Sequence, residues 1–330
     1  MKISSLSRFA FAVCPSAAIL AGCGGSQVAV PGATFSSAAS AKHGAPARSW
    51  IDPTAKAGDL VYVSAAKEVD VYTYPGGKLV GTLSSGFGSA TAMCSDARGN
   101  VWIVNPSYFG TSTLVEYAHG GNEPIATLQD PNKNIPQACS VDPVTGNLAV
   151  ANLNANIAVY ANARGSPTYY STSGLVEDVR TIAYDGSGDL YMRGFKSRKA
   201  AAWLPKGGST IAHFLVRKLG YYDWDGNYLV LDPGGLPTTA LTRYELSGAS
   251  GTRVGKVLLK SCAEGGVFSI EGSELAVVCG SGITYYEYPS GGDPIETIPG
   301  KSAGGVAISV GASHSRTRTK STFVPQSQNK

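Results

Sequence analysis

Short runs of β-forming residues, separated by turns rich in Gly and Asp, dominate the chain. One phrase recurs along it: a strand that ends in Tyr or Leu, a Gly-rich turn and a second short strand. Its anchors are Tyr74, Tyr117, Tyr160, Leu204, Tyr244 and Tyr288, and the spacings between them are 43, 43, 44, 40 and 44 residues. Such even self-similarity indicates a repeat architecture.

A second phrase lies between these anchors: a strand of small apolar residues, a polar turn and a strongly β-forming strand. Its copies are found at 92–104, 138–150, 182–191, 224–230 and 268–277. Asp and Gly supply the turns, because Asp tolerates the left-handed conformation and Gly has no Cβ to clash. Each period therefore holds four short strands. A four-stranded repeat of about 40–45 residues is typical of one blade of a β-propeller.

The two ends of the repeat region complement each other. Residues 59–84 supply only three strands, beginning with Leu60–Val63, and residues 304–310 resemble the missing first strand. Pairing them completes a sixth blade and removes the strand edges that an open ring would expose. We therefore predict an all-β fold, a six-bladed β-propeller with four-stranded blades over residues 58–311. The alternative, a linear β-solenoid, would need capping ends instead of complementary fragments.

The segment before the repeats has the pattern of an export signal. Lys2 and Arg8 precede an apolar run that is broken by Pro15 and is too short to span a bilayer. The run ends in LAGC at residues 20–23, which resembles the lipobox of bacterial lipoproteins. The resemblance implies that residues 1–22 are a signal peptide and that Cys23 receives the lipid. The alternative is an ordinary signal peptide with an incidental cysteine.

This address implies a lipid-anchored protein of the cell envelope that faces outside the cytoplasm. No acidic residue directly follows Cys23, which implies outer-membrane sorting if the source has two membranes. Acyl chains anchor lastingly because each buried CH₂ contributes about 0.8 kcal/mol. Residues 23–57 are rich in Ala, Ser and Gly, and we expect them to be the lipidated cysteine and a flexible tether. No other segment is apolar enough to span a membrane.

The segment 182–191, IAYDGSGDLY, resembles an NHL repeat, and the region 58–311 as a whole is similar to NHL and SMP-30-like six-bladed propellers. The phrases GGNEPIATL, CSVDPVTGNLAVAN, IAVY and LPKGGST more closely resemble a group of uncharacterised bacterial lipoprotein propellers. That resemblance covers most of the body. It implies the fold and the anchor, and it brings no known activity.

Four cysteines remain outside the signal peptide and lipobox. In an exported protein they suggest two disulfides, with three possible connectivities. Cys94 and Cys139 occupy similar places in the first strands of neighbouring blades, and Cys262 and Cys279 flank one hairpin. We therefore predict the disulfides Cys94–Cys139 and Cys262–Cys279. The alternative is four buried free thiols. A zinc site is disfavoured, because no His lies near these cysteines in sequence.

Charge adds little to the picture. The net charge is +4 and charged residues make up 15% of the chain. Part of the excess lies in the segment 312–330, which carries Arg316, Arg318, Lys320 and Lys330 and no acidic residue. We interpret this segment as a disordered basic tail and expect no nucleic-acid partner. The protein is expected to be a monomer.

Propeller sites gather at the mouth of the central channel, so the residue that enters each innermost strand is informative. These residues are Thr91, Gln137, Arg180, Gly220, Gly266 and Gly304. SMP-30-like lactonases place Asn, Asp and Glu there to hold a divalent cation, because hard cations prefer oxygen ligands. This ring has no carboxylate and no Asn. The resemblance to lactonases therefore ends at the fold, and we predict no metal and no cofactor.

The histidines and aspartates do not form a catalytic arrangement either. His43 lies in the tether, His314 in the tail, His119 in a turn between outer strands and His213 in an outer strand. A three-His metal centre or a Ser–His–Asp triad is not expected from these positions. Four aspartates recur at blade turns, and the preference of turns for Asp accounts for them. They are Asp96, Asp142, Asp185 and Asp225. No catalytic residue is predicted.

Polar and aromatic residues at strand ends are the candidates for ligand binding. They are Asn105, Asn152, Asn154, Arg180, Tyr221, Tyr222 and Trp224. Tyr and Trp stack on sugars or anchor a partner, although aromatic residues also fill space between blades. The leading hypothesis is a non-enzymatic binding or scaffold module for a protein, peptide or glycan. The alternative is a lactonase-like hydrolase or lyase at the channel mouth, and a quinone-dependent dehydrogenase is a third, weaker possibility.

Overall fold

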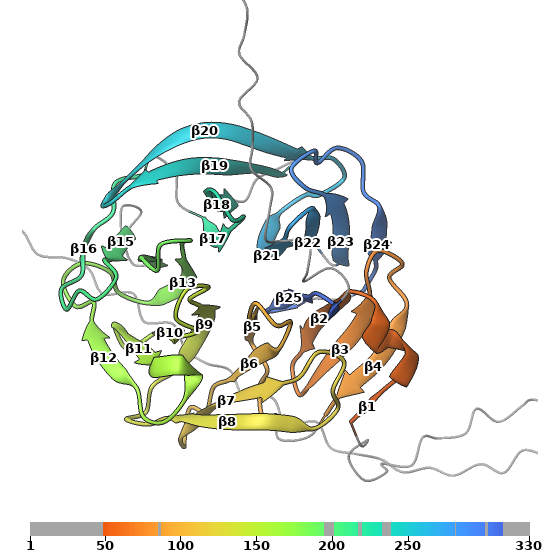
Figure 1. Cartoon of the computed structure of the whole chain (residues 1–330), viewed down its shortest axis with the longest axis horizontal. Helices are drawn as coiled ribbons and strands as arrows, with labels where there is room; N and C mark the ends of the chain where they lie inside the picture. Colours follow the sequence, from red (N-terminus) through yellow and green to blue (C-terminus); the bar gives the residue numbers. More distant parts are fainter. Residues whose placement is uncertain are drawn as a thin grey trace, which may run out of the picture. The chain divides into compact units, whose positions relative to one another are not determined.

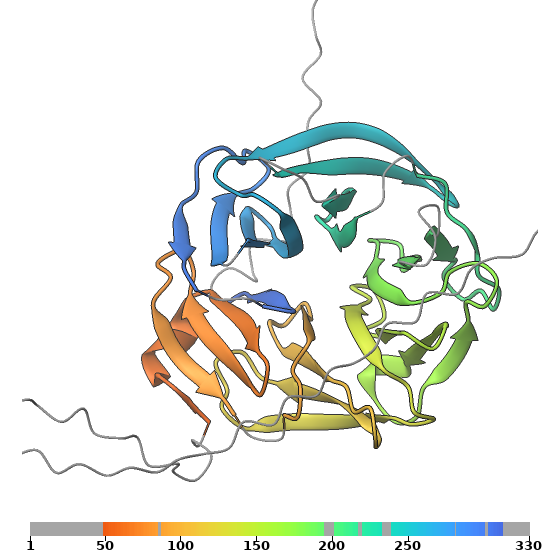
Figure 2. The ribbon, with the colours of Figure 1, turned by 180° about the vertical axis from the view of Figure 1, so that it is seen from behind.

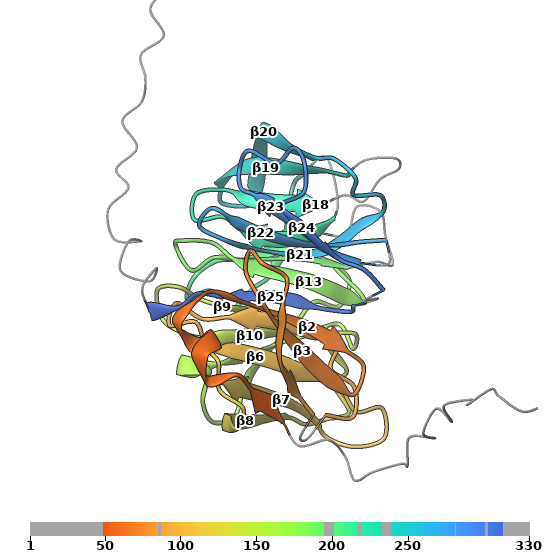
Figure 3. The ribbon, with the colours of Figure 1, turned by 90° about the vertical axis from the view of Figure 1, so that its right-hand side faces the viewer.

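Six antiparallel sheets surround a central channel in the computed structural model, which describes residues 49–312 except 85–86, 195–200, 217–219, 233–238, 281 and 301–302. Figures 1 and 2 show this ring from its two sides, and Figure 3 shows it edge-on. In five of these sheets, or blades, the strand that comes first in the sequence lies innermost, and in the sixth it is the C-terminal strand. The predicted six-bladed β-propeller with four-stranded blades is confirmed.

Five blades are continuous in sequence, and each runs from the channel outward. Blade 1 contains β5 (Ala92–Ser95), β6 (Val101–Asn105), β7 (Ser112–Tyr117) and β8 (Pro124–Asp130). Blade 2 contains β9 (Pro136–Val141), β10 (Leu148–Asn152), β11 (Asn156–Tyr160) and β12 (Thr168–Ser171), with the 3-10 helix η2 (Ala161–Ala163) between its last two strands. Blade 3 contains β13 (Val179–Tyr184), β14 (Leu190–Gly194), β15 (Ala201–Leu204) and β16 (Ala212–His213). Blade 4 contains β17 (Tyr221–Trp224), β18 (Leu229–Asp232), β19 (Thr239–Ser247) and β20 (Ser250–Leu259). Blade 5 contains β21 (Gly265–Glu271), β22 (Glu274–Cys279), β23 (Gly282–Glu287) and β24 (Glu296–Ile298).

The sixth blade, called here the closing blade, joins the two ends of the repeat region. Its innermost strand is β25 (Val306–Ser309), followed outward by β2 (Leu60–Ala65), β3 (Glu68–Thr73) and β4 (Leu79–Leu83). The register sets Leu60 opposite Ser309 and Val63 opposite Val306. In Figure 1 the blue β25 lies beside the orange β2. The predicted pairing of the C-terminal strand with the N-terminal strands is therefore confirmed.

The folded body begins before residue 58. Trp50–Ile51 form β1, which pairs with β4 and adds a fifth strand to the closing blade. Pro53–Ala57 form the 3-10 helix η1, whose start is capped by the Asp52 carboxylate accepting from the Thr54 amide at 2.9 Å. The boundary at residue 58 was set too late, because a two-residue strand and a single helical turn leave no periodic signal. The predicted signal peptide, Cys23, the rest of the predicted tether and the predicted tail from residue 313 onward lie outside the described residues.

The core lies between the blades. Alternate side chains of each strand face opposite neighbours, as the period of two in a β-strand requires. In β2, Leu60 and Tyr62 pack against blade 1, whereas Val61 and Val63 pack against blade 5. Within the described residues, six buried apolar clusters arise in this way, one at each contact between neighbouring blades.

Tyrosine side chains fill these contacts and use their hydroxyl groups to hold the next blade. Tyr160 donates to the Gln129 carbonyl at 2.9 Å, and Tyr191 donates to the Gly248 carbonyl at 3.1 Å. The same bond between neighbours is made by Tyr74 to Tyr286 O and by Tyr286 to Lys260 O. A buried tyrosine thus contributes apolar area and also satisfies a backbone carbonyl.

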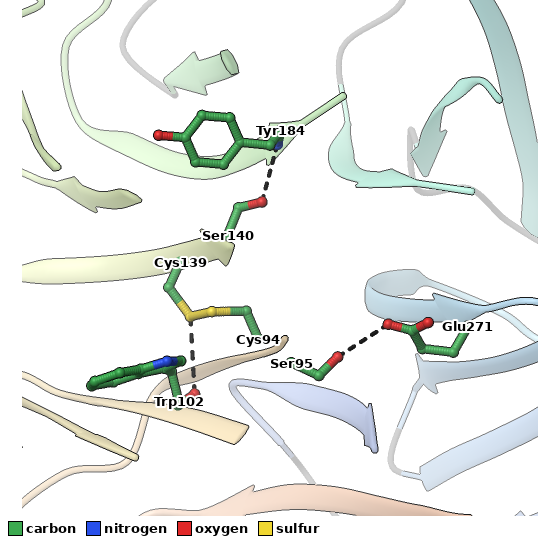
Figure 4. The surroundings of a disulfide bond; sticks show 7 residues. All are labelled: Cys94, Ser95, Trp102, Cys139, Ser140, Tyr184 and Glu271. Carbon is green, nitrogen blue, oxygen red and sulfur yellow. Dashed lines mark hydrogen bonds between the residues drawn. A yellow bond between two sulfur atoms is a disulfide. The ribbon is translucent and has the colours of Figure 1, made fainter. Parts of the chain in front are cut away.

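Both predicted disulfides are present. Cys94–Cys139 joins the innermost strands of blades 1 and 2, with the Cα atoms 5.7 Å apart, and Figure 4 shows its surroundings. Cys262–Cys279 closes the start of blade 5, with the Cα atoms 5.0 Å apart. Disulfides persist in oxidising compartments, so the two bonds indicate an oxidising, extracytoplasmic environment. Among the described residues, no helix is long and apolar enough to cross a membrane.

Candidate functional site: the central channel

The innermost strands enclose an open channel with a volume of about 1310 Å³. All six run in the same direction along it, because every blade is built from the inside outward with the same topology. We call the end where these strands begin the N-terminal mouth and the end where they finish the C-terminal mouth. The two mouths are lined by different kinds of residue, and they are described in turn below.

Hydrogen bonds between innermost strands hold the channel wall together. At four successive steps around the ring, a side-chain oxygen on one strand accepts from a backbone amide of the next. The bonds are Tyr184 N to Ser140 (3.0 Å), Tyr222 N to Thr181 (2.8 Å), Ile270 N to Asp223 (2.8 Å) and Ile308 N to Ser269 (3.1 Å). At the step from blade 1 to blade 2 the Cys94–Cys139 disulfide makes the connection, as seen beside the Ser140 bond in Figure 4. The wall is therefore rigidly tied.

The N-terminal mouth agrees in part with the predicted ring of entering residues. Thr91, Gln137, Arg180 and Gly304 line the channel. Gly220 and Gly266 do not, and the residues that follow them, Tyr221 and Val267, take their places in the lining. The only charge in this ring is already paired, because the Arg180 guanidinium forms an ion pair with Asp178 at 3.0 Å.

The seven predicted ligand-binding residues fall into two groups. Arg180, Tyr221, Tyr222 and Trp224 line the channel. The three asparagines are not among its lining residues. Asn105 accepts from the amides of Gly88 and Ser89 at 2.9 Å, the buried Asn152 donates to Asn156 at 3.0 Å, and Asn154 donates to the Lys133 carbonyl at 3.2 Å. These asparagines hold loops in place.

The carboxylates of the channel were not predicted as lining residues, although Asp96 and Asp225 among them were predicted to be turn residues. These carboxylates lie in the second half of the wall and around the C-terminal mouth: Asp96, Asp223, Asp225, Glu271 and Glu274. The residues that enter the innermost strands border only the N-terminal mouth. A prediction based on them therefore says nothing of the residues at the C-terminal mouth. A signal was available, because the position two residues before the blade turn is Ser140 in blade 2 and Asp223 in blade 4.

Asp223 is the most unusual of these acids. Its carboxylate accepts from the Ile270 amide at 2.8 Å and from the Trp224 amide at 2.8 Å. Burial between the strands raises its pKa to about 7, and the nearby Asp225 adds to the rise, while the two amides oppose it. Asp223 therefore changes its charge close to neutral pH.

Glu271 and Glu274 begin and end the hairpin turn of blade 5. Glu271 accepts a hydrogen bond from the Ser95 hydroxyl of blade 1 at 3.2 Å (Figure 4). This bond links blade 5 to blade 1 past the closing blade, which lies between them. Burial and a hydrogen bond with Asp59 raise the pKa of Glu274 to about 8. A proton shared between two carboxyl groups thus lies where blade 5 meets the closing blade.

Trp224 supplies an aromatic surface at the same mouth. Its indole lies over Gly186, where an added Cβ would stand 3.5 Å from the indole nitrogen. The ring is only partly buried and lines the channel together with Tyr184, Pro143 and Val144. An aromatic face beside carboxylates suits the stacking of a sugar ring or the binding of a cation.

No protein-family model matches the sequence, and no curated protein matches it either. Solved structures do resemble it. A chain of the nidogen/laminin complex superposes with a TM-score of 0.62 at 11% identity, covering 77% of this chain and 99% of that chain. A protein of unknown function from Bacteroides caccae gives 0.56 at 11% identity, covering 76% and 99%. A putative 6-phosphogluconolactonase from Bacteroides fragilis NCTC 9343 gives 0.50 at 12% identity, covering 78% and 99%. The likeness shows the propeller fold alone.

The four turn aspartates do what the sequence analysis assigned to them. Each accepts backbone amides of its own turn, as Asp185 does from Ser187 at 2.8 Å and Asp189 at 2.9 Å. The corresponding bonds are made by Asp96, Asp142 and Asp225. Asp225 in addition pairs with Arg243 at 2.8 Å.

One Ser–His contact lies away from the channel. His119 Nδ1 is 2.6 Å from Ser309 Oγ, and His119 Nε2 is 3.1 Å from the Gly58 carbonyl. Ser309 is fully buried and its hydroxyl donates to the Gly99 carbonyl. Burial lowers the pKa of His119. Because Ser309 is fully buried, no substrate reaches it. The contact is structural and joins the closing strand to blade 1. Within the described part of the chain, no group of three His, Cys, Asp or Glu residues is arranged to hold a metal ion.

Proposed function

We propose that the protein is a lipid-anchored, extracytoplasmic binding module that takes part of a protein, peptide or glycan ligand into its central channel without transforming it. The observation that carries the proposal is the open channel of about 1310 Å³, lined by Trp224, Tyr221 and several carboxylates. Concave sites with an aromatic surface and a few polar groups are the usual places where proteins hold ligands. The tied wall supports the proposal, since a preformed site loses little entropy on binding.

Two features of the chain support the proposed extracytoplasmic location. The LAGC motif at residues 20–23 resembles a lipobox, and the two disulfides suit an oxidising compartment. We expect cells fed a labelled fatty acid to incorporate it into the protein, and Cys23→Ser to abolish the incorporation. Equal labelling of the wild type and the variant would contradict the anchor.

Photo-cross-linking tests the binding site. Val144 is 54% exposed and lines the C-terminal mouth, whereas Val254 is 46% exposed on the outer strand β20 and is not among the lining residues. We expect Val144→benzoylphenylalanine in the full-length protein to give a discrete adduct in intact cells. Val254→benzoylphenylalanine should not give that adduct. No adduct from Val144, or the same adduct from both positions, would exclude the channel as the binding site.

A second candidate function, a lactonase-like hydrolase or lyase, is favoured by Asp223. An acid with a pKa of about 7 in a cavity is suited to general acid–base catalysis. One neighbour of the fold is a putative 6-phosphogluconolactonase, but a phosphorylated substrate would meet a channel whose charged lining residues are mostly carboxylates. Turnover of neutral sugar lactones that is lost in Asp223→Asn would establish the enzyme and refute the binding module.

A further inference from the structure

The charges that line the channel have one dominant sign. Of the charged residues that the structure describes in the lining, five are acidic and one, Arg180, is basic. Arg180 is itself paired with Asp178. Among the acids, Asp225 is paired with Arg243, and Glu274, whose pKa is raised to about 8, holds its proton at neutral pH. The whole chain, by contrast, has a net charge of +4. A water-filled space walled by one sign of charge concentrates ligands of the opposite sign, so the channel favours cations.

The carboxylate of Asp223 is not required by the fold. Its bond to the Ile270 amide is equivalent to the bonds that Ser140 and Ser269 make to the next innermost strand. A serine hydroxyl therefore performs the same structural task elsewhere in the ring. Burying a carboxylate instead of a hydroxyl opposes its ionisation, as the raised pKa of Asp223 shows. A charge that opposes stability and is not needed by the scaffold points to a ligand.

Trp224 adds a second and independent observation. Gly186 leaves room for the indole to lie against the neighbouring blade, so the ring lines the channel while it also packs against the apolar cluster between blades 3 and 4. Trp is the side chain whose ring attracts cations most strongly. Trp224 directly follows Asp223 in the sequence. The Ile270 amide donates to Asp223, and Glu271 directly follows Ile270, so the three residues lie in one region of the wall.

The acids are distributed along the wall and not gathered around one point. No group of three metal-ligating residues is found in the part of the chain that the structure describes. The channel is also far larger than a metal site needs. Both observations fit an organic cation with a body of its own better than a metal ion.

We propose that the channel binds an alkylammonium group, held between the carboxylates of Asp223 and Glu271 and the indole face of Trp224. The group can belong to a free polyamine or to a lysine side chain of a peptide. This inference rests on the proposed binding function and names the chemistry of its ligand.

Calorimetric titration of the full-length protein in detergent tests it, with two probes that separate the sources. One probe is spermidine, and the other is a lysine residue blocked at its amino and carboxyl ends. The same blocked lysine acetylated on its side chain is the uncharged control. We expect one or both charged probes to bind and the acetylated probe not to bind. Binding of neither charged probe, or equal binding of the acetylated one, overturns the proposal.

Asp223→Ser is the decisive variant, because serine keeps the acceptor for the Ile270 amide and removes the charge. We expect its Kd for the binding probe to rise at least about tenfold, with little change in Tm, since a hydrogen bond to a charged group contributes about 1.5–3 kcal/mol. Glu271→Gln is the second variant if Asp223→Ser does not fold. Glu245→Gln removes an exposed charge on β19, outside the channel lining, and is the matched control. Equal Kd values for the wild type, the channel variants and Glu245→Gln would refute the site.

The outcomes also separate this inference from the function on which it rests. A cross-linked ligand at Val144 together with no binding of spermidine or lysine leaves the binding module standing and refutes the alkylammonium ligand. Absence of both refutes both.

Discussion

The side chains of Asp223 and Ser269 each accept a hydrogen bond from a backbone amide of the next innermost strand, but only Asp223 can change its charge. Its pKa of about 7 arises first from burial and then from Asp225, whose own carboxylate is paired with Arg243. At this position a single side chain therefore joins two blades and gives the channel a charge that changes near neutral pH.

The first prediction concerns pH. Asp223 is neutral below its pKa of about 7 and negative above it, while an alkylammonium group with a pKa of about 10.4 stays charged throughout. Binding of a charged probe should therefore strengthen as the pH rises from about 6 to about 8. Titrations at the two pH values measure this change. Asp223→Ser should reduce this change to the part that Glu274 contributes, since Glu274 also lines the channel and its pKa is raised to about 8. An unchanged Kd in the wild type would contradict the role of Asp223.

At the scale of residues, the sequence predicted part of the channel lining. Arg180, Tyr221, Tyr222 and Trp224 were found because strand ends border a propeller channel. Asp223 and Glu271 were not predicted because innermost strands line the channel along their whole length. The alternation of apolar and polar residues along one strand does not show which of its side chains face the channel. Asn105 and Asn152 look like binding residues in sequence, since an amide that holds a loop has the same pattern as one that holds a ligand.

At the scale of elements, the two disulfides act on different connections. Cys94–Cys139 spans 45 residues and joins two blades at the channel wall, whereas Cys262–Cys279 spans 17 residues and lies at the start of one blade. Cys94–Cys139 was predicted from the repeat, because equivalent places in neighbouring blades are neighbours in space. Cys262–Cys279 was predicted because the two residues flank one hairpin. The short β1 and η1 were not predicted, since neither is long enough to show a period.

The second prediction compares the two bonds. The loop-closure entropy that a disulfide removes from the unfolded chain corresponds to about 3 kcal/mol for a 17-residue separation and about 4 kcal/mol for 45. Replacing Cys94 and Cys139 with serine should thus lower the free energy of unfolding by about 1 kcal/mol more than replacing Cys262 and Cys279. Denaturant titration of the two double variants measures the difference. A larger loss on the Cys262–Cys279 side would contradict the ordering.

The third prediction concerns the contact between blade 5 and the closing blade. Glu274 keeps its proton to about pH 8 in the fold, because it is buried and shares a hydrogen bond with Asp59, whereas its ordinary pKa is 4.5. The folded state binds the extra proton, so this stabilisation is full below pH 4.5 and is lost as the pH rises through 8. Glu274→Gln should keep the hydrogen bond without the titration.

Melting curves between about pH 5 and pH 9 test this contact. Glu274→Gln should melt a few degrees above the wild type at the alkaline end and close to it at the acidic end. Glu245→Gln, an exposed acid on β19, serves as the control and should follow the wild type. Parallel curves for the wild type and Glu274→Gln would contradict the shared proton.

At the scale of the whole molecule, the ring and its channel depend on one another. The repeat predicted six blades, four strands in each and the joining of the chain ends, because each of these follows from spacing and hydrophobic alternation alone. The charge of the channel did not follow from spacing. It depends on side chains in β17 and β21, at the start of β22 and in the turns after β5 and β17, which only closure brings together around one axis. A protein that did not close would have no channel in which to hold a ligand.

Closure can be measured by engineered disulfides between the chain ends. Val61 lies opposite Ile308 in the register of β2 and β25, and Val306 lies on the same face two residues away. A Cys pair forms a bond only when the Cα atoms are within about 7 Å. Val61→Cys with Ile308→Cys should oxidise nearly completely and give one cross-linked peptide by mass spectrometry, whereas Val61→Cys with Val306→Cys should not. Equal yields from the two pairs, or none from the first, would contradict the closed six-bladed ring and the channel that depends on it.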